Sequence, residues 1–193
     1  MLGLKLPTDP RWANIASRNI EEILIDHAWC EQKAAASGIS LIILYPGYTR
    51  LVDVMTEVVA EEWQHFQRVL EELKKRGYSL GPQRRDEYVV LLMALERKGG
   101  KQEWRLLDRL LLNALIEARS CERFRLLSLE VSDPELREFY HELMVSEAGH
   151  YRVLLDLARE YNPEEVVKKR WNEFLEEEAK IIASLDVRDD RIH

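Results

Sequence analysis

Apolar residues recur every three or four positions through most of this chain, which is the spacing that places them on one face of an α-helix. Turn signals such as Tyr45-Pro46-Gly47, Gly77 and Ser132-Asp133-Pro134 interrupt the pattern. No alternating apolar and polar pattern of useful length indicates a β-strand. The sequence therefore predicts an all-α protein with four long amphipathic helices, at about 18–45, 49–76, 102–130 and 134–161.

Three shorter helices accompany the long ones in this interpretation. Asp9-Pro10 is typical of a helix cap followed by proline in the first turn, and Asn162-Pro163 repeats that signal before a last helix. Gly81-Pro82 marks a turn that precedes a short helical pattern in the connection between the second and third long helices. The expected short helices cover about 10–16, 85–97 and 163–185.

Composition limits the kind of protein. The chain of 193 residues suits one domain, taken as 1–193, and 46% hydrophobic with 33% charged residues is typical of amphipathic helices. No apolar run approaches the roughly 20 residues that cross a bilayer, and no signal-peptide core is present, so we expect a cytoplasmic protein and no membrane. A net charge of −7 argues against broad nucleic-acid binding but leaves a local basic patch possible.

Two copies of Glu-x-x-His stand out, Glu62 with His65 and Glu147 with His150. A Glu and a His three positions apart lie on one face of a helix, so that one metal ion can contact both side chains. Two such helices, with one further Glu from each of two other helices, form the di-iron or di-manganese site of ferritin-like four-helix bundles. The motifs therefore predict that fold class, and the two halves of the chain match as duplicated helical hairpins.

The two remaining carboxylates must lie level with these motifs. Glu31 lies about as far before the Tyr45 turn as Glu62 lies beyond the start of its own helix. On the third long helix the same comparison favours Glu117, although alignment of the two halves favours Glu122. Glu122 is one turn from Arg119 and is interpreted as a charged residue at the rim. The predicted metal ligands are Glu31, Glu62, His65, Glu117, Glu147 and His150.

Other candidates are interpreted as supporting or unrelated residues. A third copy of the motif, Glu138 with His141, points away from His150 because positions nine apart differ by about 180° around a helix. His27, one turn before Glu31, is interpreted as a residue beside the site rather than a ligand. Cys30 and Cys121 are expected to be reduced packing residues.

The ligand types narrow the chemistry. Four carboxylates and two imidazoles suit iron or manganese better than structural zinc, which prefers tetrahedral nitrogen and sulfur ligands. A di-iron centre of this type can use O₂ to hydroxylate C–H bonds, and it can equally serve a ferroxidase that handles metal ions. A third possibility is a helical interaction module whose acidic residues form ordinary ion pairs.

Four stretches of the sequence resemble the MiaE family of tRNA-modifying monooxygenases. They are LIDHAWCEQKAA at 24–35, EEWQH at 61–65, IEARSCERF at 116–124 and SEAGHY at 146–151. The resemblance implies a non-haem di-iron enzyme that uses O₂ and an external electron donor of the ferredoxin or reductase type. Its implied reaction is hydroxylation of the isopentenyl side chain of 2-methylthio-N6-isopentenyladenosine, beside the anticodon of tRNA. The six predicted ligands are the iron ligands that the resemblance implies.

A tRNA substrate requires positive charge somewhere on this acidic chain. Basic residues gather between the second and third long helices, with Tyr78, Tyr88 and Trp104 among them. Phosphate contacts combined with aromatic stacking are how proteins bind RNA loops. We therefore expect this patch to hold the tRNA anticodon arm. Its basic residues are Lys74, Lys75, Arg76, Arg84, Arg85, Arg97, Lys98, Lys101, Arg105 and Arg109.

Overall fold

A computed structural model describes residues 2–192, and these residues form seven α-helices and no β-strand. The helices are α1 Pro10–Ala16, α2 Ile20–Leu44, α3 Thr49–Lys75, α4 Glu87–Met93, α5 Gln102–Glu130, α6 Pro134–Tyr161 and α7 Glu164–Ser184. The predicted all-α class, the four long helices and the three accessory helices are confirmed. None of the described helices is long and apolar enough to cross a membrane.

The connecting helix α4 is shorter than the predicted 85–97. It begins after Asp86, whose side chain caps the helix by accepting a hydrogen bond from the Val89 backbone N–H at 3.1 Å. It ends at Met93 because the chain then turns toward α5. There the Arg97 backbone N–H donates to Asp108 Oδ2 at 2.8 Å instead of continuing the helix.

The described chain divides into two compact units, and each is described by itself. One contains residues 2–13 and 86–187, and the other contains residues 14–85 and 188–192. The single domain over 1–193 stays a prediction.

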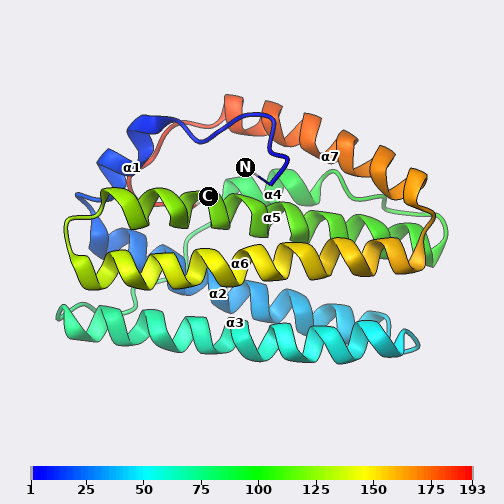
Figure 1. Cartoon of the computed structure of the whole chain (residues 1–193), viewed down its shortest axis with the longest axis horizontal. Coiled ribbons are helices and arrows are strands. Elements are labelled where there is room, and N and C mark those ends of the chain that lie inside the picture. Colours follow the sequence, from blue (N-terminus) through cyan, green and yellow to red (C-terminus); the bar gives the residue numbers. More distant parts are fainter. Residues whose placement is uncertain (1, 193) are drawn as a thin grey trace. The chain divides into compact units, whose positions relative to one another are not determined.

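The unit of residues 14–85 is built on an antiparallel hairpin of α2 and α3 (Figure 1). The turn falls at Tyr45-Pro46-Gly47 as predicted, with Tyr45 buried and in edge contact with Tyr48 at 6.0 Å between ring centroids. Gly38 lies at a close approach of the two helices, since an added Cβ there would come within 2.5 Å of Val59 Cγ2. The missing side chain of Gly38 therefore allows the helices to pack together.

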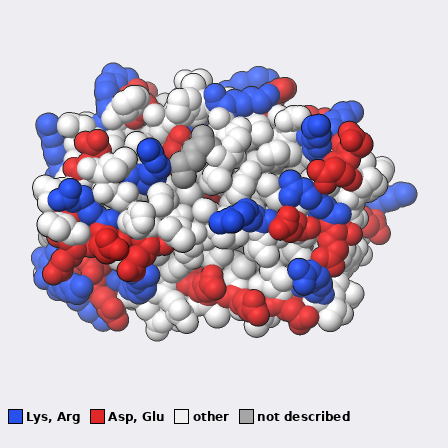
Figure 2. Space-filling model, in the orientation of Figure 1, with Lys and Arg blue, Asp and Glu red and all other residues white. Residues whose placement is uncertain are grey.

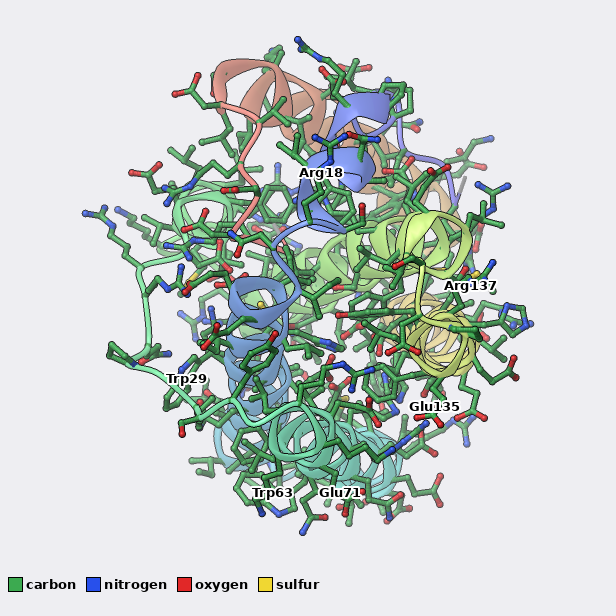
Figure 3. All side chains as sticks on the ribbon, turned by 90° about the vertical axis from the view of Figure 1, so that its left-hand side faces the viewer. Arg18, Trp29, Trp63, Glu71, Glu135 and Arg137 are labelled. Carbon is green, nitrogen blue, oxygen red and sulfur yellow. The ribbon has the colours of Figure 1, made fainter. Side chains whose placement is uncertain are left out.

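The loop after α3 and the C-terminal segment are both fastened to α2. The Trp29 indole points from α2 toward this loop and donates to the Gly81 carbonyl at 3.0 Å (Figure 3). The Ile192 backbone N–H donates to Asp26 Oδ2 at 2.8 Å. Arg84 donates to Asp190 Oδ2 at 2.8 Å and also pairs with Glu22. These bonds anchor the first turns of α2 from two sides.

The second unit is built on an antiparallel hairpin of α5 and α6 (Figure 1), so each unit contains a helical hairpin, and their origin by duplication stays a prediction. The Asp133 carboxylate accepts from the Glu135 and Leu136 backbone N–H groups, and Pro134 occupies the first turn, as predicted for the start of α6. Helices α4 and α7 pack against α5, most of whose residues are buried.

Two networks of buried charge hold the shorter segments of this unit to α5. Asp108 is fully buried and accepts hydrogen bonds from Arg97 and, at 2.8 and 3.0 Å, from Arg170 of α7. Burial alone would raise the pKa of Asp108, but the hydrogen bonds from Arg97 and Arg170 outweigh it, so that the pKa is lowered. Arg119, also fully buried, donates from Nη2 at 2.5 Å to Glu178 of α7.

Gly38 and Gly149 offer a matched test of the α2–α3 contact. Gly38→Ala gains helix propensity of about 1 kcal/mol but forces a methyl group against Val59, so we expect net destabilisation of about 1–3 kcal/mol. Gly149→Ala adds its methyl group at an exposed position with nothing within 4 Å, so it should stabilise the protein by up to about 1 kcal/mol. Urea denaturation of the metal-free proteins measures both, and equal effects would contradict the close packing.

Candidate metal centre

The first group of candidate ligands lies on the α2–α3 hairpin. Glu31 comes from α2, and Glu62 and His65 come from consecutive turns of α3. One ligand atom from each of the three side chains lies within 4.8 Å of the other two, and all three side chains are buried. The i, i+3 spacing of Glu62 and His65 places both on the α3 face that packs against α2. Two carboxylates and one imidazole therefore meet within this unit, as predicted.

Histidines on both sides hold the Glu31 carboxylate. His27 Nε2 is 2.7 Å from Glu31 Oε1, and His65 Nδ1 is 3.5 Å from Glu31 Oε2. Burial is the largest single effect and raises the pKa of Glu31, but the hydrogen bonds from His27 and His65 together with other neighbouring contributions outweigh it and lower the pKa well below its usual range. Glu31 is therefore an ionised carboxylate, which is the form that binds a metal ion. His27 contacts a candidate ligand directly.

The second group lies on the α5–α6 hairpin. Glu117 comes from α5, and Glu147 and His150 come from α6. One ligand atom from each of these buried side chains again lies within 4.8 Å of the other two. His150 Nδ1 is 3.7 Å from Glu147 Oε2. This unit therefore brings together a second set of two carboxylates and one imidazole.

The Glu122 carboxylate contacts Thr8 and Arg119 and lies outside both groups of candidate ligands. Its Oε2 accepts from the Thr8 hydroxyl at 2.6 Å and from the Thr8 backbone N–H at 3.1 Å, and it also pairs with Arg119. The rim interpretation was wrong, because both Glu122 and Arg119 are buried. The opposite charges of Arg119 and Glu122 were a misleading signal, since these two residues form a buried cluster with Thr8 and Glu178 rather than a solvated face. The geometry favours Glu117 over Glu122 as the α5 ligand.

The remaining sequence candidates fall outside the two groups. Glu138 and His141 are both exposed on α6, so the prediction that this third motif is a surface pair is confirmed. Cys121 is buried with its Sγ 3.3 Å from the Met144 carbonyl, and Cys30 is half-buried with its Sγ 3.9 Å from Asp26 Oδ2. Burial and then the nearby Glu147, Glu117 and Glu122 raise the pKa of the Cys121 thiol to about 12. Cys121 is therefore a neutral packing residue.

The donor set fits iron or manganese. Carboxylate oxygen and imidazole nitrogen are ligands that both metals accept, and no thiolate that would favour zinc contributes to either group. Each ligand side chain is buried, so a bound metal would be shielded from bulk water. A helical hairpin that presents Glu and Glu-x-x-His from facing helices is the half-site of the carboxylate-rich metal proteins with a ferritin-like fold.

The helices and their ligand sets define an all-helical protein of the ferritin-like class. Consistent with this, the structure of "Protein 43 with aldehyde deformylating oxygenase activity from Synechococcus" matches with a TM-score of 0.93 and 36% sequence identity. The match covers 98% of this chain and 94% of that one. The predicted fold class is confirmed.

The chain belongs to the MiaE family, tRNA-(MS[2]IO[6]A)-hydroxylase, whose model matches residues 2–193. Two relatives are each named tRNA 2-(methylsulfanyl)-N(6)-isopentenyladenosine(37) hydroxylase. The Pseudomonas putida protein is 41% identical over 161 residues, which cover 83% of this chain and 77% of the relative. The Salmonella typhimurium protein is 29% identical over 245 residues, which cover 98% and 87%. The family resemblance and the expectation of an oxidoreductase are confirmed.

Substitutions can distinguish the expected metal-binding role of Glu117 from the structural role of Glu122. We expect Glu117→Gln to lose one carboxylate ligand and to weaken binding of Fe²⁺ by about 10–100-fold or more, with a near-normal melting temperature. Glu122→Gln should bind metal normally but lose about 1–3 kcal/mol of stability, because buried Arg119 loses an ionised partner. Anaerobic Fe²⁺ titration and thermal denaturation of both variants make the comparison. Loss of metal only in Glu122→Gln would contradict the assignment.

Proposed function

We propose that this chain is a di-iron monooxygenase that hydroxylates the isopentenyl side chain of 2-methylthio-N6-isopentenyladenosine in tRNA, next to the anticodon. The observation that carries the proposal is the family match over residues 2–193 in a chain that also holds both Glu and Glu-x-x-His groups. The names of the two hydroxylase relatives support the same substrate. O₂ and an electron-transfer partner of the ferredoxin or reductase type would complete the reaction, in the cytoplasm.

In this proposal the two hairpins of a single domain, 1–193, together supply the iron ligands. Glu31, Glu62 and His65 would come from one hairpin, and Glu117, Glu147 and His150 would come from the other. Iron bound there would supply the O₂-dependent chemistry that hydroxylates a C–H bond of the isopentenyl group. The protein contributes ligand geometry, because each ligand projects from the middle of a long helix rather than from a loop.

The protein also contributes a dry environment. All six proposed ligands are buried, and side chains such as Leu24, Leu110 and Leu143 are fully buried on the same helices. Exclusion of water strengthens electrostatic interactions within a site and limits side reactions of an oxidising centre. An allylic side chain without charge is compatible with such surroundings, whereas a hydrated metal ion passing through a ferroxidase would favour a polar path.

The structure narrows the part of the basic patch that is proposed to bind RNA. Arg84 pairs with Glu22 and Asp190, and Lys75 pairs with Glu72 in the same unit. Tyr88 is buried and cannot stack on a base. Such internally paired or buried side chains are poorly placed to contact phosphate. Figure 2 shows acidic and basic side chains interspersed on this face, so a basic side chain here commonly has acidic neighbours.

Trp104 is the best-placed aromatic residue of the patch. Its side chain is 42% exposed, and Arg97 and Lys101 lie 5.7 and 5.6 Å from its ring centroid. Gly100 has a φ of 89° and lies so near that an added Cβ would come within 3.0 Å of the ring. Exposed Lys98 and Arg105 are close by in the sequence. A fixed indole with Lys101 beside it suits contact with a base and its phosphates, and this segment is our candidate contact for the anticodon arm.

Analysis of modified nucleosides tests the function. A host that lacks the gene should contain 2-methylthio-N6-isopentenyladenosine in its tRNA without the hydroxylated form, and expression of this chain should restore that form. Liquid chromatography with mass spectrometry of digested tRNA makes the measurement. A Glu147→Ala variant, which lacks a proposed ligand, serves as the control and should restore nothing. Unchanged hydroxylation without the gene, together with Fe²⁺ oxidation by the pure protein, would favour a ferroxidase instead.

The RNA contact has its own test. Lys101→Glu with Arg105→Glu should weaken binding to an anticodon stem-loop and lower the slope of log Kd against log salt by about 2. The matched control, Arg125→Glu with Arg137→Glu, changes two exposed arginines at the other end of the α5–α6 hairpin and should have little effect. Trp104→Ala should weaken binding about tenfold, whereas Trp63→Ala, with a 47% exposed side chain (labelled in Figure 3), should not. Equal effects of test and control variants would contradict this surface.

A further inference from the structure

The two duplicated hairpins differ at one position next to a proposed ligand. In α2 the residue one helical turn before Glu31 is His27, whereas in α5 the residue one turn before Glu117 is Asn113. Residues four apart face each other on a helix, so each of these side chains is a neighbour of its glutamate. The chemistry beside the two proposed metal positions is therefore not the same.

His27 is built into the Glu31 site. Its side chain is 0% exposed, and its Nε2 lies 2.7 Å from Glu31 Oε1, a short and well-formed hydrogen bond. The other oxygen, Oε2, is the atom nearest His65 Nδ1, at 3.5 Å. One oxygen of Glu31 is thus held by His27, and the other is directed to the side where Glu62 and His65 lie.

The backbone that carries His27 is held as well. Asp26, the preceding residue, accepts a hydrogen bond from the Ile192 backbone N–H at 2.8 Å. Trp29, two residues further on, donates to the Gly81 carbonyl at 3.0 Å. These contacts fix the helical turn on both sides of His27, so its imidazole can hold Glu31 in one orientation.

Asn113 has a different arrangement. Its Nδ2 donates to the Arg109 carbonyl at 3.0 Å, one turn back along its own helix. An amide side chain bound to the helix backbone is half-buried here, in contrast to the fully buried imidazole of His27. The two hairpins therefore present similar proposed ligands but different groups beside them.

We propose that His27 is a positioning residue that holds Glu31 Oε1, leaves Oε2 for the metal, and so makes the two metal positions inequivalent. A partner that hydrogen-bonds a ligating carboxylate fixes the orientation of that ligand, and loss of such partners costs about 10–100-fold in metal affinity. This inference rests on the proposed di-iron site. It assigns a tighter, more ordered position to the metal bound by Glu31, Glu62 and His65.

Cobalt titration of the full-length apoprotein tests the inference without reference to activity. Co²⁺ absorption and metal analysis should show two equivalents bound by the wild type. His27→Ala should weaken one of the two by about 10–100-fold and change its absorption band. His27→Gln, which can still donate a hydrogen bond, should restore most of the affinity. Asn113→Ala, the matched variant of the other hairpin, should change both affinities by less than about threefold.

A second measurement uses only the wild-type protein, in case His27→Ala does not fold. Mössbauer spectra of the ⁵⁷Fe²⁺-loaded protein should contain two distinct quadrupole doublets of equal area. A single doublet, or normal binding of both Co²⁺ equivalents by folded His27→Ala, would overturn the positioning role while leaving the metal centre intact. Fewer than two equivalents bound by the wild type would instead overturn the proposed centre and the inference with it.

Discussion

Carboxylate side chains buried on helices are the feature on which the rest of this structure depends. A carboxylate removed from water without a partner costs several kcal/mol, so helices that carry one must supply compensation. In each hairpin the compensation begins with an imidazole that lies beside two glutamates. The lowered pKa of Glu31 shows how this works, because hydrogen bonds from His27 and His65 overcome the opposing effect of burial. The same arrangement leaves carboxylate oxygens together where a cation can bind.

Helix α5 is the element that links this chemistry to the remainder of its unit. It carries Glu117, and it also carries Asp108 and Arg119, whose buried ion pairs reach the connection before α5 and the accessory helix α7. Burial lowers the pKa of the neighbouring Arg123 to about 10, and its guanidinium lies 4.7 Å from the ring centroid of Trp12. Breaking a buried pair leaves an uncompensated charge, so these contacts hold the short segments in one arrangement around the helix.

The duplicated hairpin explains both what the two units share and how they differ. Each presents one glutamate from its first helix and a Glu-x-x-His pair from its second, with the same i, i+3 geometry on the second helix. Residues outside the ligand set have diverged, as His27 and Asn113 illustrate. In the proposed centre the two hairpins would supply similar ligands in different surroundings, and a reaction that treats two metal ions differently could make use of that difference.

The sequence alone determined the helices, their turns and most of the candidate ligands. Helix periodicity, turn signals and short motifs all depend on residues close together in the sequence. For this reason the turns at Tyr45-Pro46-Gly47 and Asp133-Pro134 and both Glu-x-x-His pairs could be recognised without coordinates. The tertiary structure decided which charged residues are buried and with which partners. Glu122 looked like a rim residue because its partner Thr8 lies far away in the sequence, and Arg84 looked available because Asp190 is similarly distant. Pairings of this kind depend on how remote segments pack, and no local pattern records them.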